Sequence, residues 1–245
     1  MNTTQLAQEG LKIDWASMPT YNTIMSIAAG AGLLGIVIFV KQLMTKPTEV
    51  SAEGWSLAFG VLGTILTTTG LHMTLTWPLA AGGFPFDNII FGETSLGFGV
   101  LLLAASVYMW RRGAEALTRP EPLAALAKVA QPISVFIGGL GLALFGIAVA
   151  GVKYQLFAAP PQEPISGEFA EWPLVEAIFM SGLFALVGVG AVLFPFVVNS
   201  MKNATTKAAL PIKITGIVWA VAGIVFILFG AMNFFTHIGL IVNTM

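Results

Sequence analysis

Six long runs of apolar residues alternate with short polar segments along the chain. Each run reaches the roughly 20 residues that a helix needs to cross about 30 Å of hydrocarbon. Helices are expected rather than strands, because an unpaired backbone polar group is very unfavourable in lipid. The pattern therefore predicts an all-α polytopic membrane protein, a six-helix transmembrane bundle. The runs cover residues 21–40, 55–76, 89–110, 129–152, 173–198 and 214–233.

The composition agrees with a surface that faces lipid. Hydrophobic residues make up 56% of the 245-residue chain and charged residues only 9%, whereas globular proteins average about 25% charged. So few charges cannot cover the water-facing surface of a soluble domain, and residues 21–245 are expected to form a single transmembrane domain. Residues 1–20 carry Glu9, Lys12 and Asp14. They lack the basic and then apolar order of a signal peptide, so they are expected to remain as an N-terminal segment.

The basic residues are distributed unevenly between the two sides of the predicted bundle. All but two of the 11 Lys and Arg residues lie in alternate connections on one side, and Lys12 and Lys153 lie on the other. Basic residues near helix ends are retained in the cytoplasm. Both termini are therefore predicted to lie outside the cytoplasm, in a multi-pass protein of the bacterial plasma membrane. The basic side holds Lys41, Lys46, Arg111, Arg112, Arg119, Lys128, Lys202, Lys207 and Lys213.

A weak internal similarity favours three repeated helical hairpins, formed by the first and second, third and fourth, and fifth and sixth runs. The third and fifth runs each begin with a carboxylate, Glu93 or Glu176, and a glycine follows each of them in the same register. The alternative is that all glycine-rich membrane helices share such features. The sequence leaves both interpretations open.

Ionisable residues within or next to the runs gather near the predicted outer boundary of the membrane. They are His72, Glu93, Glu176 and His237, and two imidazoles with two carboxylates suit a transition metal. Two alternatives are a haem b held between the imidazoles and a quinone or lipid head group in the same pocket. Against all three, Glu93 and Glu176 can neutralise the positive ends of their helices, and the histidines can hydrogen-bond at the interface. No cofactor is therefore predicted, and these four residues remain the candidate metal ligands.

Two connections have distinct compositions. Residues 111–128 are rich in charge and are expected to hold a short surface helix. Residues 158–172 are rich in proline and acidic side chains, which is typical of a solvated loop.

A short motif follows the second run. Trp77-Pro78-Leu79 precedes Asn88-Ile89-Ile90-Phe91-Gly92-Glu93, and this segment resembles an uncharacterised domain-of-unknown-function family of small polytopic membrane proteins, mostly actinobacterial and archaeal. The resemblance implies no activity. It implies that Trp77, Asn88 and Glu93 act as one conformational unit, in which Glu93 is buried near the turn and accepts hydrogen bonds from a loop that Asn88 helps to order.

No catalytic set stands out in the sequence. The chain has no Cys, and it lacks a His-Glu-x-x-His motif or a Ser–His pair within one run. We therefore favour a non-enzymatic accessory or structural subunit of a larger membrane complex, by analogy with the small polytopic accessory subunits of some actinobacterial respiratory supercomplexes. The alternative is a binder or transporter of a small molecule, metal or quinone through the outer polar pocket. The expected partners are lipid and other membrane-protein subunits, and the absence of a basic block argues against nucleic acid.

Overall fold

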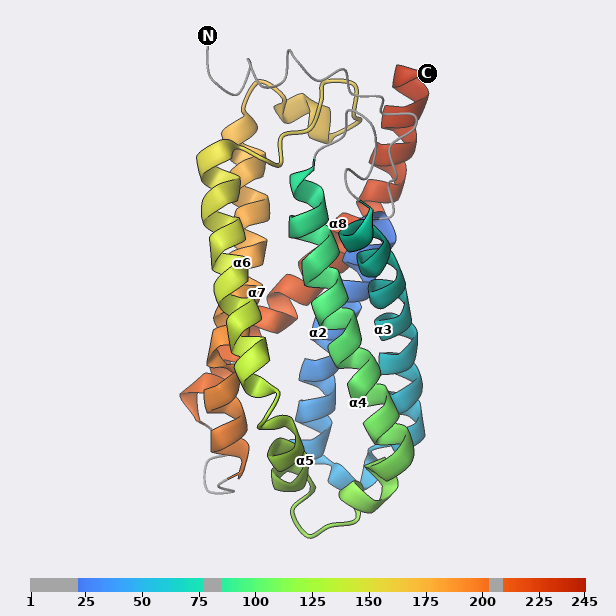
Figure 1. Ribbon diagram of the computed structural model, residues 1–245, viewed down its shortest axis with the longest axis vertical. Helices are drawn as coiled ribbons and strands as arrows, with labels where there is room; N and C mark the ends of the chain where they lie inside the picture. The colour runs from blue at the N-terminus through green and yellow to red at the C-terminus, as the bar shows by residue number, and fades with distance from the viewer. Residues whose placement is uncertain (1–21, 77–84, 203–208) are drawn as a thin grey trace.

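The computed structural model describes residues 22–76, 85–202 and 209–245. Within these residues the chain is all-helical, without strands, and six of its helices are long and apolar enough to cross a membrane. The prediction of a six-helix transmembrane protein is confirmed (Figure 1). The spans are α2 (Asn22–Thr45), α3 (Ala52–Leu75), α4 (Thr94–Leu117) with the π-helical segment Asn88–Glu93 before it, α6 (Ser134–Tyr154), α7 (Pro173–Lys202) and α8 (Leu210–Thr244). The shorter elements are α5 (Pro122–Ala130), η1 (Pro47–Glu49) and η3 (Ser166–Phe169).

The helices extend beyond the apolar runs that predict them. Helix α8 has 35 residues, so at about 1.5 Å per residue it exceeds the thickness of the hydrocarbon. A run of apolar residues predicts only the part of a helix that lies in lipid. The helical backbone hydrogen bonds continue beyond that part into the polar ends. The charged connection after α4 does hold a helix, α5. It ends at Ala130 because Pro132 interrupts the helical backbone before α6.

The six spans pack as three close pairs: α3 with α4, α6 with α7, and α2 with α8. These pairs are offset by one helix from the hairpins that the internal similarity favours. The partners in the first two pairs follow each other across the segments 76–87 and 155–172. Helices α2 and α8 are antiparallel, and α2 begins at the end of the bundle where α8 ends (Figure 1). We call this end the terminal end.

Glycines at the crossings explain how each pair packs so closely. A Cβ atom built on Gly30 of α2 would lie 2.5 Å from the carbonyl oxygen of Gly223 in α8, and one on Gly99 of α4 would lie 2.5 Å from the backbone nitrogen of Thr67 in α3. Real Cβ atoms are not accommodated at such distances, so only glycine permits the crossing. The α6–α7 pair uses Gly141 against Val192 and Gly188 against Gly141.

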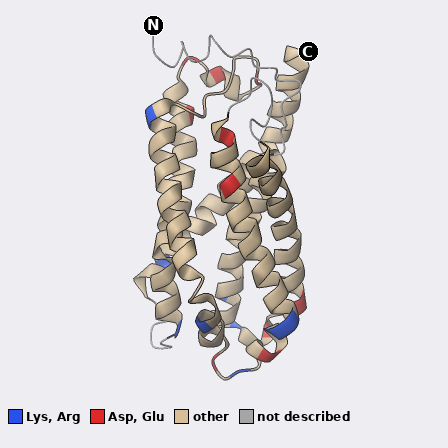
Figure 2. Cartoon of the chain, viewed as in Figure 1, with Lys and Arg blue, Asp and Glu red and all other residues tan. Residues whose placement is uncertain are grey.

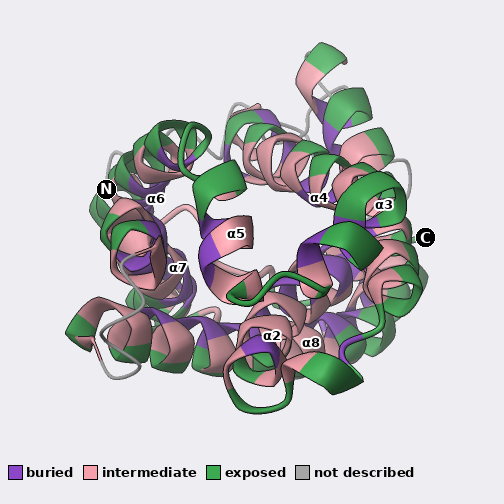
Figure 3. Ribbon diagram, turned by 90° about the horizontal axis from the view of Figure 1, so that it is seen from below, coloured by how far each residue is buried: buried purple, intermediate pink, exposed green. Residues whose placement is uncertain are grey.

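The Lys and Arg residues of the described part of the chain are concentrated at the end opposite the terminal end, whereas Asp and Glu occur at both ends (Figure 2). We call this opposite end the basic end, and α5 lies across it inside the ring of spans (Figure 3). Among the described residues, Lys153 in the last turn of α6 is the basic side chain of the terminal end. The charge asymmetry is thus a feature of the folded bundle, and the assignment of the basic end to the cytoplasm stays a prediction.

Candidate polar site at the terminal end

A carboxylate that the sequence analysis did not select lies buried at the terminal end. Glu163 belongs to the segment between α6 and α7, and it is only 8% exposed. Its Oε1 atom lies 3.6 Å from Nε2 of His237 in α8. A turn fixes its backbone, because the Glu163 N–H donates to the Pro160 carbonyl oxygen at 3.0 Å. The segment between α6 and α7 therefore contacts α8 through a carboxyl group and an imidazole.

Further contacts fasten the same segment to the last turns of α8. The Asn243 side-chain amide donates to the Gln162 carbonyl oxygen at 2.8 Å. Pro164 packs on Gly239 so closely that a Cβ atom at position 239 would overlap the proline ring. The segment 158–172 was expected to be a solvated loop, and that expectation is wrong for its central part. Three prolines restrict the conformations of this stretch, which lowers the entropy lost when it packs.

Glu176 connects this segment to the start of α7. Its Oε2 atom accepts a hydrogen bond of 2.6 Å from the Ala159 N–H, and its charge lies close enough to Glu163 for the two carboxylates to repel each other. The Thr236 hydroxyl lies beside the Glu163 carboxylate without reaching hydrogen-bonding geometry. Glu163, Glu176, Thr236 and His237 thus form one group, which we call the Glu163 cluster.

The electrostatics of the cluster follow from burial. Removal of water raises the pKa of the Glu163 carboxyl above its ordinary value of 4.5, because the low-dielectric surroundings disfavour the charged form. Asp87, which precedes the π-helical segment, shows the same effect: burial raises its pKa to about 7. Both groups can therefore hold a proton at pH values where an exposed carboxyl has lost it.

Several buried polar atoms near the cluster have no hydrogen-bond partner among the described residues. They include Nδ1 of His237 and Oγ1 of Thr236. Buried polar atoms in proteins are nearly always paired with protein or water. Water or a small polar ligand bound beside the Glu163 carboxyl would supply the partners that these atoms lack.

The four candidate metal ligands divide into two sets. Glu176 and His237 belong to the Glu163 cluster, whereas His72 on α3 and Glu93 before α4 are exposed and do not belong to it. Over the described ranges, no three His, Asp or Glu side chains are arranged to hold a metal ion. Metal, haem or quinone binding by the predicted set stays a prediction.

The structure describes two of the three residues of the predicted loop-ordering unit, Asn88 and Glu93. Asn88 is buried, and its side-chain amide donates to the Met73 carbonyl oxygen and, at 2.6 Å, to the Thr76 carbonyl oxygen. These bonds satisfy carbonyl groups that the end of α3 leaves open, as a loop-ordering role requires. The expectation that Glu93 is buried is wrong, because it is exposed. It ends a π-helical segment, whose extra residue rotates later side chains away from α-helical positions. Trp77 lies outside the described residues.

The sequence contains one local signal that points to Glu163. It is an acidic residue flanked by Pro160, Pro161 and Pro164, and a stiff segment of this kind can hold a side chain against a neighbouring helix. The contact itself joins positions 163 and 237, and no local pattern relates them.

Comparison with known proteins gives one finding. No curated protein and no solved structure matches the chain. A family model does match, over residues 18–239, and its description is "Protein of unknown function (DUF981)". The resemblance drawn from the Trp77–Glu93 segment to an uncharacterised domain-of-unknown-function family is thereby confirmed. Since the match covers nearly the whole chain, the protein belongs to the DUF981 family, whose members share a domain of unknown function.

Proposed function

We propose that the protein is a non-catalytic subunit of a larger membrane complex, and that the outward face of α6 contacts its partner. This proposal rests on a set of small residues on that face against which none of the described helices packs. Cβ atoms built on Gly139 and Gly146 would meet nothing within 4 Å, and the neighbouring Ala143 is exposed. Residues 139 and 143 follow the small-xxx-small spacing of packed membrane helices.

The remaining side chains of this face have the spacing of a helix–helix contact. Val135, Leu142 and Val149 are 78%, 65% and 67% exposed, and they alternate with the two glycines at intervals of four and three residues. This is the interval at which apolar side chains form one seam along a helix. A glycine in an exposed helix is unfavourable by about 1 kcal/mol relative to alanine. Glycines at the helix crossings of this protein compensate for this cost by close packing. Gly139 and Gly146 receive no such compensation from the part of the chain that the structure describes.

The natural absence of Cys allows a direct test in native membranes. Gly139→Cys and Gly146→Cys would introduce single thiols, which a bifunctional thiol reagent can join to a neighbouring chain. We expect both variants to be cross-linked to a second polypeptide. Leu57→Cys on α3, where the residue is 71% exposed, is the control and should remain unlinked. A cross-linked dimer of this chain alone would contradict the proposal, because it would assign the face to self-association.

Substitution and purification give a second test of the same face. Gly139→Leu and Gly146→Leu should remove a stoichiometric partner from the protein purified in mild detergent, while the melting temperature is retained. Gly182→Leu on α7 is the matched control, since this glycine also has nothing within 4 Å. A respiratory assembly would be recognised by haem-containing subunits in the same chromatographic peak. Purification of the wild type as a lone monomer would exclude the proposal.

The orientation in the bacterial plasma membrane belongs to the same proposal. The basic end is assigned to the cytoplasm by its Lys and Arg residues, so the segment 155–172 lies outside. Glu168→Cys should react with a membrane-impermeant maleimide on intact cells. Glu121→Cys, before α5, should react only after permeabilisation. The reverse labelling pattern would overturn the orientation.

A second candidate function rests on the Glu163 cluster. The buried carboxyl of Glu163 and the unpartnered polar atoms beside it favour binding of a small polar ligand or ion at the terminal end. Elemental analysis and the ultraviolet–visible spectrum of the purified protein test the metal and haem versions. A bound metal or chromophore should be lost in Glu163→Gln and kept in Glu168→Gln, which changes an exposed glutamate of the same segment. An identical result for wild type and both variants would exclude these versions.

A further inference from the structure

An open hollow runs along the outward side of α4 toward the basic end. Its volume is about 870 Å³. The lining changes character along its length, from aliphatic side chains in the middle of the helix to a phenol and two guanidinium groups at the basic end. The lining residues are Val100, Leu103, Ala104, Val107, Tyr108, Arg111 and Arg112. They recur every three or four positions, so they share one face of the helix.

The polar end of the hollow lies at the depth of lipid head groups. Trp110 precedes the two arginines and is 74% exposed. Tryptophan side chains favour the boundary between hydrocarbon and head groups. Arg111 and Arg112 are therefore placed beside the phosphates of the leaflet at the basic end, and Val100 and Val107 lie beside its acyl chains.

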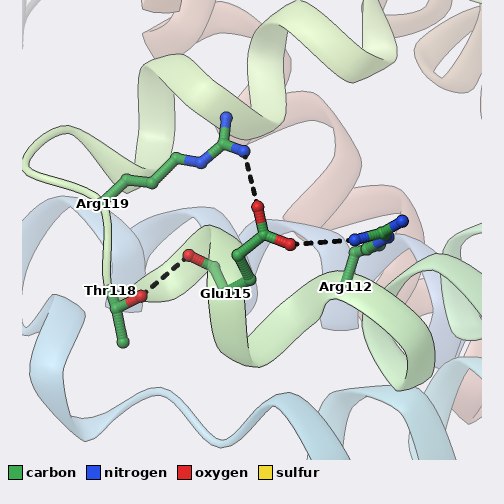
Figure 4. A network of polar contacts seen from close by, with 4 residues as sticks. All are labelled: Arg112, Glu115, Thr118 and Arg119. Atoms are coloured by element: carbon green, nitrogen blue, oxygen red, sulfur yellow. Dashed lines mark hydrogen bonds and ion pairs between the residues drawn. The ribbon is translucent and has the colours of Figure 1, made fainter.

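The positive charge of this end is only partly neutralised by the protein. Glu115 accepts hydrogen bonds from Arg112 at 3.2 Å and from Arg119 at 3.0 Å (Figure 4). One carboxylate is thus shared by two guanidinium groups. Arg111 makes no ion pair with another described residue. The two guanidinium groups that line the hollow, Arg111 and Arg112, face one carboxylate that is shared with Arg119, so the charge beside the apolar hollow remains positive.

We propose that this hollow binds one anionic phospholipid. The phosphate lies against Arg111 and Arg112, the Tyr108 hydroxyl donates to a head-group oxygen, and an acyl chain follows the aliphatic side chains toward Val100. Arginine is suited to this role because its planar donors match phosphate oxygens. Basic sites at the membrane surface recognise anionic lipids in this way.

Native mass spectrometry of the purified full-length protein tests the proposal. Phosphatidylglycerol and phosphatidylcholine with identical acyl chains are the two probes, and we expect phosphatidylglycerol to be retained preferentially. Arg111→Gln should reduce its occupancy about fivefold, as the loss of one arginine near a lipid surface predicts. Arg119→Gln is the matched control. It removes the same charge from the same end of the bundle but lies outside the hollow, so it should leave occupancy within about twofold of the wild type, because the charges it leaves unchanged are those beside the head group.

A second variant tests whether an acyl chain is part of the ligand. Ala104→Phe fills the hollow without changing its charge, and it should also reduce phosphatidylglycerol occupancy. Ala231→Phe, at an exposed alanine of α8, should not. Unchanged binding in Ala104→Phe, or displacement of the lipid by inorganic phosphate, would show a site for free anions and overturn the proposal. Equal retention of the two lipids by the wild type, or equal losses in Arg111→Gln and Arg119→Gln, would also overturn it. Melting temperatures confirm that each variant is folded.

Discussion

The two ends of the bundle differ in how far their charged side chains are exposed to solvent. At the basic end, the ion pairs Lys46–Glu49 and Arg112–Glu115 are exposed to solvent, with more than half of each side chain accessible. At the terminal end, Glu163 is buried against His237, and this contact joins two segments that are far apart in sequence. Exposed pairs contribute little because water screens them. A buried carboxyl depends strongly on the contacts around it, because removing one partner leaves a polar group in surroundings of low dielectric constant.

This contrast leads to different expectations for the two ends. Substitutions at the basic end should change local charge and lipid contact with little effect on the fold. Substitutions at the terminal end should change stability and its dependence on pH, because the segment 155–172 is held by a few specific contacts. The following variants test the contrast in order of decreasing effect, each by the melting temperature of the protein in detergent.

Gly239→Leu should have the largest effect. Its side chain would overlap Pro164 and force the segment 155–172 away from α8. Overpacking of this kind destabilises proteins by about 1–3 kcal/mol, and we expect the upper part of that range. Gly216→Leu on the same helix is the control, because a Cβ atom there meets nothing within 4 Å. Equal melting temperatures for both variants would show that the segment is not packed on α8.

Asn88→Ala should come next. It removes the donors to the Met73 and Thr76 carbonyl oxygens at the end of α3. Buried acceptors left without a partner are unfavourable by about 1–3 kcal/mol, so a loss of about 2 kcal/mol is expected. Hydrogen exchange should locate the loss in the last turn of α3. Protection unchanged there would remove the loop-ordering role of Asn88.

Asp87→Asn should reveal the pH dependence of the terminal end. The pKa of Asp87 rises from 3.8 in the unfolded chain to about 7 in the fold. The folded protein therefore binds the proton more tightly, and the wild type loses stability as pH rises from about 3.8 to about 7. Asp87→Asn removes this loss, so its advantage over the wild type should be absent at pH 3.5, grow as the pH rises, and level off above about pH 7. A difference independent of pH would contradict the burial of this carboxyl.

Glu115→Gln should have the smallest effect. It breaks exposed ion pairs with Arg112 and Arg119, and such pairs contribute about 0–1 kcal/mol. The melting temperature should therefore stay close to that of the wild type at low and at high salt. A large, salt-independent drop would show that the basic end depends on this carboxylate as the terminal end depends on its buried groups.

The sequence predicted the spans better than their arrangement. Helix α6 and helix α7 are each visible as an apolar run, but their close pairing rests on the contact of Gly141 with Val192. The chain has 27 glycines, and each of the six runs contains several of them, so their positions alone do not show which faces meet. The favoured hairpins therefore differ by one helix from the observed pairs.

The candidate site was likewise predicted only in part from the sequence. Glu176 and His237 were selected because ionisable side chains near a membrane boundary are conspicuous in an apolar sequence. His72 and Glu93 met the same criterion, yet they lie exposed outside the Glu163 cluster. Glu163 was not selected, because an acidic residue between prolines has the local signature of a solvated loop. Its burial arises from the fit of Pro164 on Gly239 and from the bond between Asn243 and Gln162.

The amino-acid sequence by itself determined which segments enter the membrane and how charge is divided between the ends. Both depend on local composition, since lipid selects long apolar runs wherever they occur in the chain. The tertiary structure decided which helices pair, which carboxyl is buried and which glycines face outward. These features depend on contacts between distant positions, such as 30 with 223 and 163 with 237, and the local pattern of apolar and polar residues carries no record of them.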